Sequence, residues 1–184
     1  MGWFRKTAPT EPLAMTMTGV KLGDRLLVIG ASDPALIAAL ATKSGLTGRA
    51  CIMDADGARV SRAAAAIERE GALVEAMSAP WSALPYATGS FDVAIVRDVL
   101  APMADDERSR VLLEVFRVLR AGGRVIVIDQ APRGGIGGFI SGRTVDTAYA
   151  EEGAARALSA VGFAATRVLA EREGTRFAEG VKRG

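Results

Sequence analysis

The sequence contains no histidine and a single cysteine, Cys51. The absence of histidine excludes catalytic groups of the Ser-His-Asp and Cys-His kinds, together with every metal site that needs an imidazole ligand. One cysteine can form neither an internal disulfide nor a thiolate metal cluster, so we expect no metal centre. Cys51 stands in an apolar stretch, where we interpret it as a small buried residue rather than a reactive thiol.

Long hydrophobic runs and an excess of charge are also missing. No apolar run approaches the roughly 18 residues of a membrane-spanning helix, and the N-terminus lacks the apolar block of a signal peptide. We therefore expect a cytoplasmic protein without a membrane span. The net charge is only +2, and arginines alternate with acids along the chain, so nucleic acid is not an expected partner.

The chain does contain a large apolar fraction, 49%, much of it alanine, with 24% charged residues. This composition is typical of a globular protein, and the alanine indicates helices. A length of 184 residues suits one domain with a substantial core and is short for two. We expect an N-terminal lead-in or short covering helix over residues 1–20, followed by one domain over residues 21–184.

Residues 26–54 hold the pattern around which the rest of the chain is organised. The apolar run Leu26–Ile29 stops at Gly30, a helical pattern follows, and a second apolar run ends at the carboxylate of Asp54. In a parallel sheet, this order leaves a crevice at the carboxyl ends of both strands, where the acid can bind a ribose diol. The sequence therefore predicts a site for a small molecule that carries a nucleoside.

The rest of the chain alternates the same two kinds of element. Apolar runs predict strands over residues 25–29, 50–53, 73–77, 91–96 and 124–128. Helical spacing predicts a helix from Asp33, its N-cap, to Gly45, and further helices that end at Gly71, at Gly122-Gly123 and near residue 161. This alternation predicts an α/β fold with a doubly wound sheet.

The C-terminal third differs from this alternation in two ways. Five glycines fall within residues 134–142, which we interpret as either a substrate lid or a loose connection. Two closing strands are predicted over residues 163–170 and 175–181, joined by a turn near residues 173–174. Strands so closely linked must pair antiparallel.

Two separated segments carry a resemblance to a known family. LPYATGSFDVAIVRDVL and EVFRVLRAGGRVIVID resemble the "LPF-x-x-x-SFD" and "R-x-LRPGGR" segments of class I S-adenosylmethionine-dependent methyltransferases, particularly of the ubiquinone and menaquinone biosynthesis branch. The resemblance covers the chain from about Leu22 onward. It implies a Rossmann-like, mostly parallel sheet of seven strands in the order 3-2-1-4-5-7-6, with the last strand antiparallel, in a three-layer αβα arrangement. It also implies S-adenosylmethionine as the cofactor.

The cofactor residues of that family match this chain unevenly. Gly30 falls on the first glycine of the cofactor turn and Asp54 on the acid that holds the ribose hydroxyls. Ser32 and Pro34 stand where the family has its other two glycines, and Val28 stands where it usually has an acid. Pro80 replaces an Asp that commonly meets the adenine amino group, but Trp81 beside it could stack on the base. The resemblance implies a cofactor site made of Gly30, Ala31, Ser32, Asp54, Ala55, Pro80, Trp81 and Arg97.

Several of these features have plainer interpretations, which the sequence leaves open. The turn after residue 29 can be an ordinary strand-to-helix connection, and Asp54 can be a strand-end acid. Asp56 is, however, the more obvious cap of the next helix, which leaves Asp54 free. Arg97 and Asp98 can contact cofactor or acceptor, or simply pair with each other. NAD is disfavoured, because Asp33 would place a carboxylate where a pyrophosphate needs free N–H groups.

The absence of histidine suits methyl transfer, because a sulfonium is already an activated leaving group and its displacement needs mainly alignment and exclusion of water. We predict an S-adenosylmethionine-dependent methyltransferase that acts on an unidentified small molecule. Its catalytic residues are not identified, and Asp98 is the nearest candidate base. The alternative, favoured by the departures at Val28 and Pro80, is a methyltransferase-like fold without catalysis that serves as a binding or scaffold protein. A homodimer is one way to cover the exposed active edge.

Overall fold

The computed structural model describes residues 12–130, 147–172 and 174–184. Its helices are α1 (Pro12–Thr18), α2 (Pro34–Ser44), α3 (Gly57–Arg69), α4 (Asp105–Val118) and α5 (Thr147–Ala160). Its strands are β1 (Arg25–Ile29), β2 (Arg49–Asp54), β3 (Glu75–Ser78), β4 (Phe91–Arg97), β5 (Leu119–Gln130), β6 (Ala164–Arg172) and β7 (Thr175–Val181).

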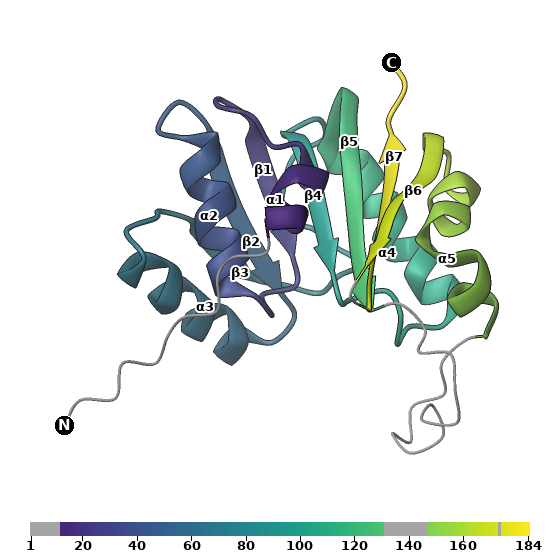
Figure 1. Ribbon diagram of the computed structural model, residues 1–184, viewed down its shortest axis with the longest axis horizontal. Helices are drawn as coiled ribbons and strands as arrows, with labels where there is room; N and C mark the ends of the chain where they lie inside the picture. The colour runs from purple at the N-terminus through teal and green to yellow at the C-terminus, as the bar shows by residue number, and fades with distance from the viewer. Residues whose placement is uncertain (1–11, 131–146, 173) are drawn as a thin grey trace.

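The strands form one seven-stranded sheet in the order β3-β2-β1-β4-β5-β7-β6. The pairs from β3 to β5 are parallel, and β7 runs antiparallel to both of its neighbours. Helices α2 and α3 lie toward one side of the molecule and α4 and α5 toward the other, with the sheet between them (Figure 1). The predicted Rossmann-like order and the antiparallel last strand are confirmed.

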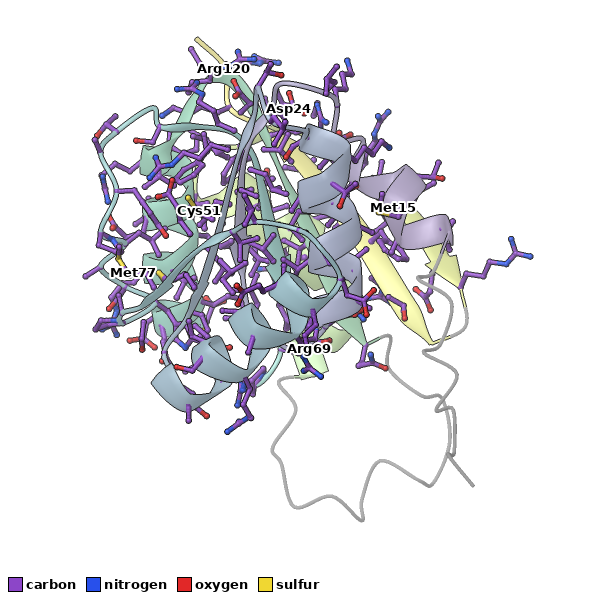
Figure 2. The ribbon with its side chains drawn as sticks, turned by 90° about the vertical axis from the view of Figure 1, so that its left-hand side faces the viewer. Met15, Asp24, Cys51, Arg69, Met77 and Arg120 are labelled. Carbon is purple, nitrogen blue, oxygen red and sulfur yellow. The ribbon has the colours of Figure 1, made fainter. Side chains whose placement is uncertain are left out.

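Two apolar cores lie on the two faces of the sheet. Leu26 and Val28 belong to the core shared with α1, α2 and α3, whereas Leu27 and Ile29 belong to the core shared with α4 and α5. Both faces of β1 are therefore buried, which explains why the central strands read as continuous apolar runs. Cys51 is fully buried in the second core and lies in the interior in Figure 2, and burial raises the pKa of its thiol to about 11.

Two predicted boundaries are wrong, and one predicted helix is interrupted. Strand β3 begins at Glu75, and Leu73 is exposed in the segment before it. Helix α4 ends at Val118 rather than at Gly122-Gly123, because Leu119 already pairs with Phe91 at the start of β5. Helix α5 is interrupted at Gly153, whose φ of 66° is not helical. Strand pairing overrides the helical spacing at Leu119, and a local backbone turn interrupts it at Gly153. The predicted loop over residues 134–142 lies outside the described residues.

Helix α1 falls within the predicted N-terminal lead-in. Its Ala14 is fully buried in the core that also holds Leu26 and Ile126, and the hydroxyl of Thr18 donates to the carbonyl of Met15 at 3.0 Å. The division of the chain at residue 20 stays a prediction. In the part of the chain that the structure describes, no helix is long and apolar enough to cross a bilayer.

At the amino end of the sheet, the carboxylate of Asp92 links three strands. Asp92 Oδ2 accepts hydrogen bonds from the backbone N–H of Arg25 at 2.8 Å and from its Nε at 3.0 Å. Asp92 Oδ1 accepts from Nη2 of Arg25 at 3.2 Å and from Nε of Arg120. These contacts join the amino-terminal ends of β1, β4 and β5. Although burial opposes the charged form, the hydrogen bonds from Arg25 and Arg120 hold the pKa of Asp92 well below its usual range.

We expect Asp92→Asn to lower the free energy of unfolding at pH 7 by about 1–3 kcal/mol, because charge-assisted hydrogen bonds are lost. A carboxylate with a depressed pKa contributes stability that is present above its unfolded-state pKa of about 4 and is lost as the pH falls toward its folded-state pKa. Urea unfolding of the wild type and of Asp92→Asn from pH 7 to pH 3 should therefore show that the difference between their unfolding free energies becomes smaller as the pH falls. The control Glu75→Gln, which removes an exposed pair with Arg49, should change stability by less than about 0.5 kcal/mol. A difference that does not vary with pH would contradict this account of Asp92.

Candidate functional site

The sequence-predicted residues meet at the carboxyl edge of the parallel strands. Gly30, Ala31 and Ser32 follow β1. Asp54 ends β2 and Ala55 follows it, and Arg97 ends β4. Ala31 is joined to Asp54, and Arg97 is joined to the turn after β1 through Asp33. Pro80 and Trp81 line a pocket together with Ala55. Figure 2 shows Asp24 and Arg120 together at the opposite, amino edge.

The turn after β1 approaches the end of β4 closely. Gly30 has a φ of +97°, and a Cβ at this position would lie 2.3 Å from the carbonyl oxygen of Arg97. Only glycine fits there, because a side chain would collide with the neighbouring backbone. Asp33 caps α2 by accepting from the N–H of Leu36 at 3.0 Å, as predicted, and the hydroxyl of Ser32 donates to Asp98 Oδ2 at 3.4 Å. The close packing of this turn against β4 therefore requires glycine at position 30, whether or not a cofactor binds there.

Asp54 lies at the tip of β2 with a side chain that is 1% exposed. Its Oδ2 accepts from the N–H of Ala31 at 3.0 Å and from Nη1 of Arg59 at 3.2 Å, and its Oδ1 accepts from the N–H of Asp56 at 3.0 Å. Asp56 caps α3, as the sequence indicated, by accepting from the N–H of Ala58. The expectation that this cap leaves Asp54 free is wrong, because three donors of the chain already surround its carboxylate.

A pocket of about 440 Å³ opens beside Ala55. It is lined by Ala55, Ser78, Ala79, Pro80, Trp81, Ser82, Glu107 and Val111. Trp81 is half-buried against the core, so it forms a wall of this pocket rather than filling it. The volume falls in the range of about 300–1,000 Å³ that is common for small-molecule sites.

Glu107 is a pocket residue that the sequence did not indicate. It lies in the first turn of α4, where acids are expected simply because they favour a helix N-terminus. Among the described residues, no hydrogen bond or ion pair holds its carboxylate. Only the packing of α4 across the loop after β3 brings it to the pocket, and the sequence contains no signal for that contact.

Arg97 and Asp98 form the ion pair that was one of their two interpretations. Arg97 Nε lies 3.6 Å from Asp98 Oδ2, and Nη2 lies 3.1 Å from Asp33 Oδ2. Nevertheless, the Nε and Nη1 atoms of Arg97 are buried and make no hydrogen bond within the described ranges. Asp98 has a φ of +54°, a conformation that is uncommon for a non-glycine residue and is often found at functional sites. The guanidinium therefore retains donors for an anionic group.

Asp129 is a buried carboxylate at the end of β5 that the sequence did not single out. Its Oδ2 accepts from the hydroxyl of Tyr149, and its Oδ1 has no partner within the described part of the chain. The guanidinium carbon of Arg108 lies 3.9 Å from the centre of the Tyr149 ring. Burial raises the pKa of Asp129 to about 6, with Asp98 adding to this effect and the Tyr149 hydrogen bond opposing it. A group that titrates near neutrality is thus present although the chain has no histidine.

Comparison with known proteins identifies a family. A family model described as a methyltransferase domain matches residues 27–127. The chain is 29% identical over 140 residues to an uncharacterised protein of Mycobacterium tuberculosis, covering 73% of this chain and 47% of that protein. It is 28% identical over 114 residues to the ubiquinone/menaquinone biosynthesis C-methyltransferase UbiE of Klebsiella pneumoniae, covering 61% of this chain and 45% of that enzyme. The chain spans about half the length of these curated relatives.

Solved structures share the fold at low identity. An S-adenosylmethionine-dependent methyltransferase from Aquifex aeolicus superposes with a TM-score of 0.76 at 17% identity, covering 94% of this chain and 89% of that one. The [4+2]-cyclase SpnF superposes with a TM-score of 0.70 at 18% identity, covering 93% of this chain and 78% of that one. At these identities the comparisons establish the architecture alone.

The raised pKa of Asp129 predicts a specific pH dependence of stability. Its ordinary pKa is 3.8 and its folded-state pKa is about 6, so between these values the folded chain holds a proton that the unfolded chain has lost. Stability should therefore fall as the pH rises from about 4 to 6. Asp129→Asn should remove this pH dependence, because an amide does not titrate in this range. Its oxygen can still accept the hydrogen bond from Tyr149.

We expect the unfolding free energy of Asp129→Asn relative to wild type to increase by on the order of 1–3 kcal/mol between pH 4 and pH 6.5 in urea titrations. Glu68→Gln, at an exposed position on α3, should show no such trend. A relative stability that stays constant over this range would mean that Asp129 titrates normally.

Proposed function

The chain belongs to the methyltransferase-domain family, and on that premise we propose that it is an S-adenosylmethionine-dependent methyltransferase that acts on a small molecule. Family membership indicates S-adenosylmethionine as the cofactor. The observation that carries the proposal is the pocket between Ala55, Trp81 and Glu107, which lies next to the carboxylate of Asp54. A nucleoside needs a slot for its base and an acceptor for its diol, and these neighbouring features supply both.

Each part of the cofactor has a complementary group at this edge. The Asp54 carboxylate would accept from the ribose hydroxyls, and Trp81 would stack on the adenine. Arg97 would donate its unsatisfied Nε and Nη1 hydrogens to the carboxylate of the amino-acid end. Asp33 and Asp98, which already flank Arg97, suit an ammonium and a sulfonium nearby. The observed geometry therefore fits the charges of this cofactor.

When bound, the cofactor supplies a methyl group already activated by a positively charged sulfur. The chain then has to hold the acceptor in line and exclude water. A base is needed only where the acceptor loses a proton. Asp129, with a pKa of about 6, is a candidate for that task near pH 7, because a base works best when its pKa lies near the operating pH. The role of Asp98 as a base stays a prediction.

A second candidate is a binding or scaffold protein without methyl transfer. The engaged state of Asp54, with three donors on its carboxylate, favours it. One structural neighbour is a [4+2]-cyclase, so the fold does not by itself fix the reaction. Cofactor binding separates the two candidates.

We expect titration calorimetry to give micromolar affinity for S-adenosylmethionine and S-adenosylhomocysteine. Asp54→Ala should abolish the heat, and Asp54→Asn should weaken binding at least tenfold, because the diol loses a charged acceptor. Thermal unfolding of both variants checks that they are folded, and Asp24→Asn at the opposite edge serves as the matched control. No heat from the wild type at millimolar ligand would leave only the scaffold candidate.

The pocket should also distinguish adenine from other nucleobases in the ligand. Since Pro80 has no side-chain acceptor, Glu107 is the pocket carboxylate that can accept from the adenine amino group. Wild type should bind S-adenosylhomocysteine about tenfold more tightly than its inosine analogue, which carries a carbonyl in place of that amino group. Glu107→Ala should lose most of this preference, whereas Asp106→Ala, on the same turn but outside the pocket, should keep it. A preference unchanged in Glu107→Ala would exclude this role.

A further inference from the structure

Arg59 is the one side chain among the three donors that hold Asp54. It lies in the first turn of α3, and its Nη1 donates to Asp54 Oδ2 at 3.2 Å. The other two donors, the N–H groups of Ala31 and Asp56, belong to backbone fixed by the turn after β1 and by the start of α3. Only Arg59 can therefore leave Asp54 without disturbing the fold.

The acceptor capacity of Asp54 is nearly used up. A carboxylate offers about four lone-pair positions, and three of them already receive hydrogen bonds. Two ribose hydroxyls need two positions, so one of the three present donors must leave the carboxylate when a diol binds. The side chain of Asp54 is 1% exposed while that of Arg59 is 48% exposed, which places the removable donor on the solvent side.

When Arg59 leaves Asp54, its guanidinium can pair with the carboxylate of Asp56 instead. Its Nη2 lies 3.9 Å from Asp56 Oδ2. Asp56 uses Oδ1 to cap α3, accepting from the N–H groups of Ala58 and Arg59, and in the described part of the chain Oδ2 makes no hydrogen bond. The guanidinium thus stands between a buried acceptor and an exposed one.

We propose that Arg59 determines the affinity of the site by competing with the ribose diol for Asp54, and that it transfers to Asp56 when a nucleoside ligand binds. The inference rests on the proposed function, because it takes the diol to be the group that displaces Arg59. Arg59 is 48% exposed, so water can hydrate its guanidinium when it leaves Asp54, and the ribose hydroxyls replace it as donors to the buried carboxylate. The competition should therefore change affinity by about three- to tenfold rather than abolish binding.

The test is calorimetry with S-adenosylhomocysteine. Arg59→Met keeps the length and apolar stem of the side chain but removes its charge, and it should bind about three- to tenfold more tightly than wild type. Arg62→Met, a similar change at an exposed position one turn further along α3, should leave the affinity within twofold. Thermal unfolding verifies that both variants are folded.

Asp56→Asn tests the second position of the guanidinium. The amide oxygen can still cap α3, but the charge that receives Arg59 is gone, so binding should weaken about two- to fivefold. In the Arg59→Met background the same change should have no effect, because no guanidinium is left to relocate. This non-additivity distinguishes competition from independent effects of two surface charges.

The outcomes separate this inference from the function on which it rests. Tighter binding by Arg59→Met together with a non-additive Asp56→Asn supports it. Equal or weaker binding by Arg59→Met, with wild type still binding, overturns the competition and leaves the proposed function in place. Absence of heat from wild type and Arg59→Met alike overturns both.

Discussion

The carboxyl edge of this sheet depends on the Asp54 carboxylate. Its two oxygens hold the backbone of the turn after β1 and the backbone at the start of α3, which fixes the two loops that border the crevice. A buried carboxylate is stable only when hydrogen-bonded, and the chain supplies these donors from its own main chain. The acid is therefore a structural support of the site and, in the proposed function, its main ligand-binding group. Arg59 is the contact in which these two roles conflict.

The groups around Asp54 divide the edge into two regions of different chemistry. On the β3 side, the pocket at Trp81 is lined by small and aromatic residues with a single carboxylate, Glu107. On the β4 and β5 side, Arg97, Asp98 and Asp129 form a charged region with incompletely satisfied buried atoms. A molecule with an aromatic base at one end and charged groups at the other matches this division.

Features set by local sequence were predictable. Continuous apolar runs located the central strands, Asp33 and Asp56 were recognised as caps, and two quoted segments indicated the sheet order. The sequence could not show that Arg59 reaches Asp54, since this requires the strand tip and the first turn of α3 to meet in space. Glu107 joins the pocket, and Tyr149 joins Asp129, through packing between distant elements. The start of β5 at Leu119 was missed because strand pairing there overrides helical spacing.

The central claim is that the tip of β2 and the neighbouring pocket together hold a nucleoside. A crystal structure of the protein with S-adenosylhomocysteine tests it most directly. The account predicts the ribose diol on the Asp54 carboxylate, the adenine against Trp81, and the Arg59 guanidinium turned to Asp56. A ligand bound elsewhere on the sheet, with the Asp54 contacts to Ala31, Asp56 and Arg59 unchanged, would contradict it.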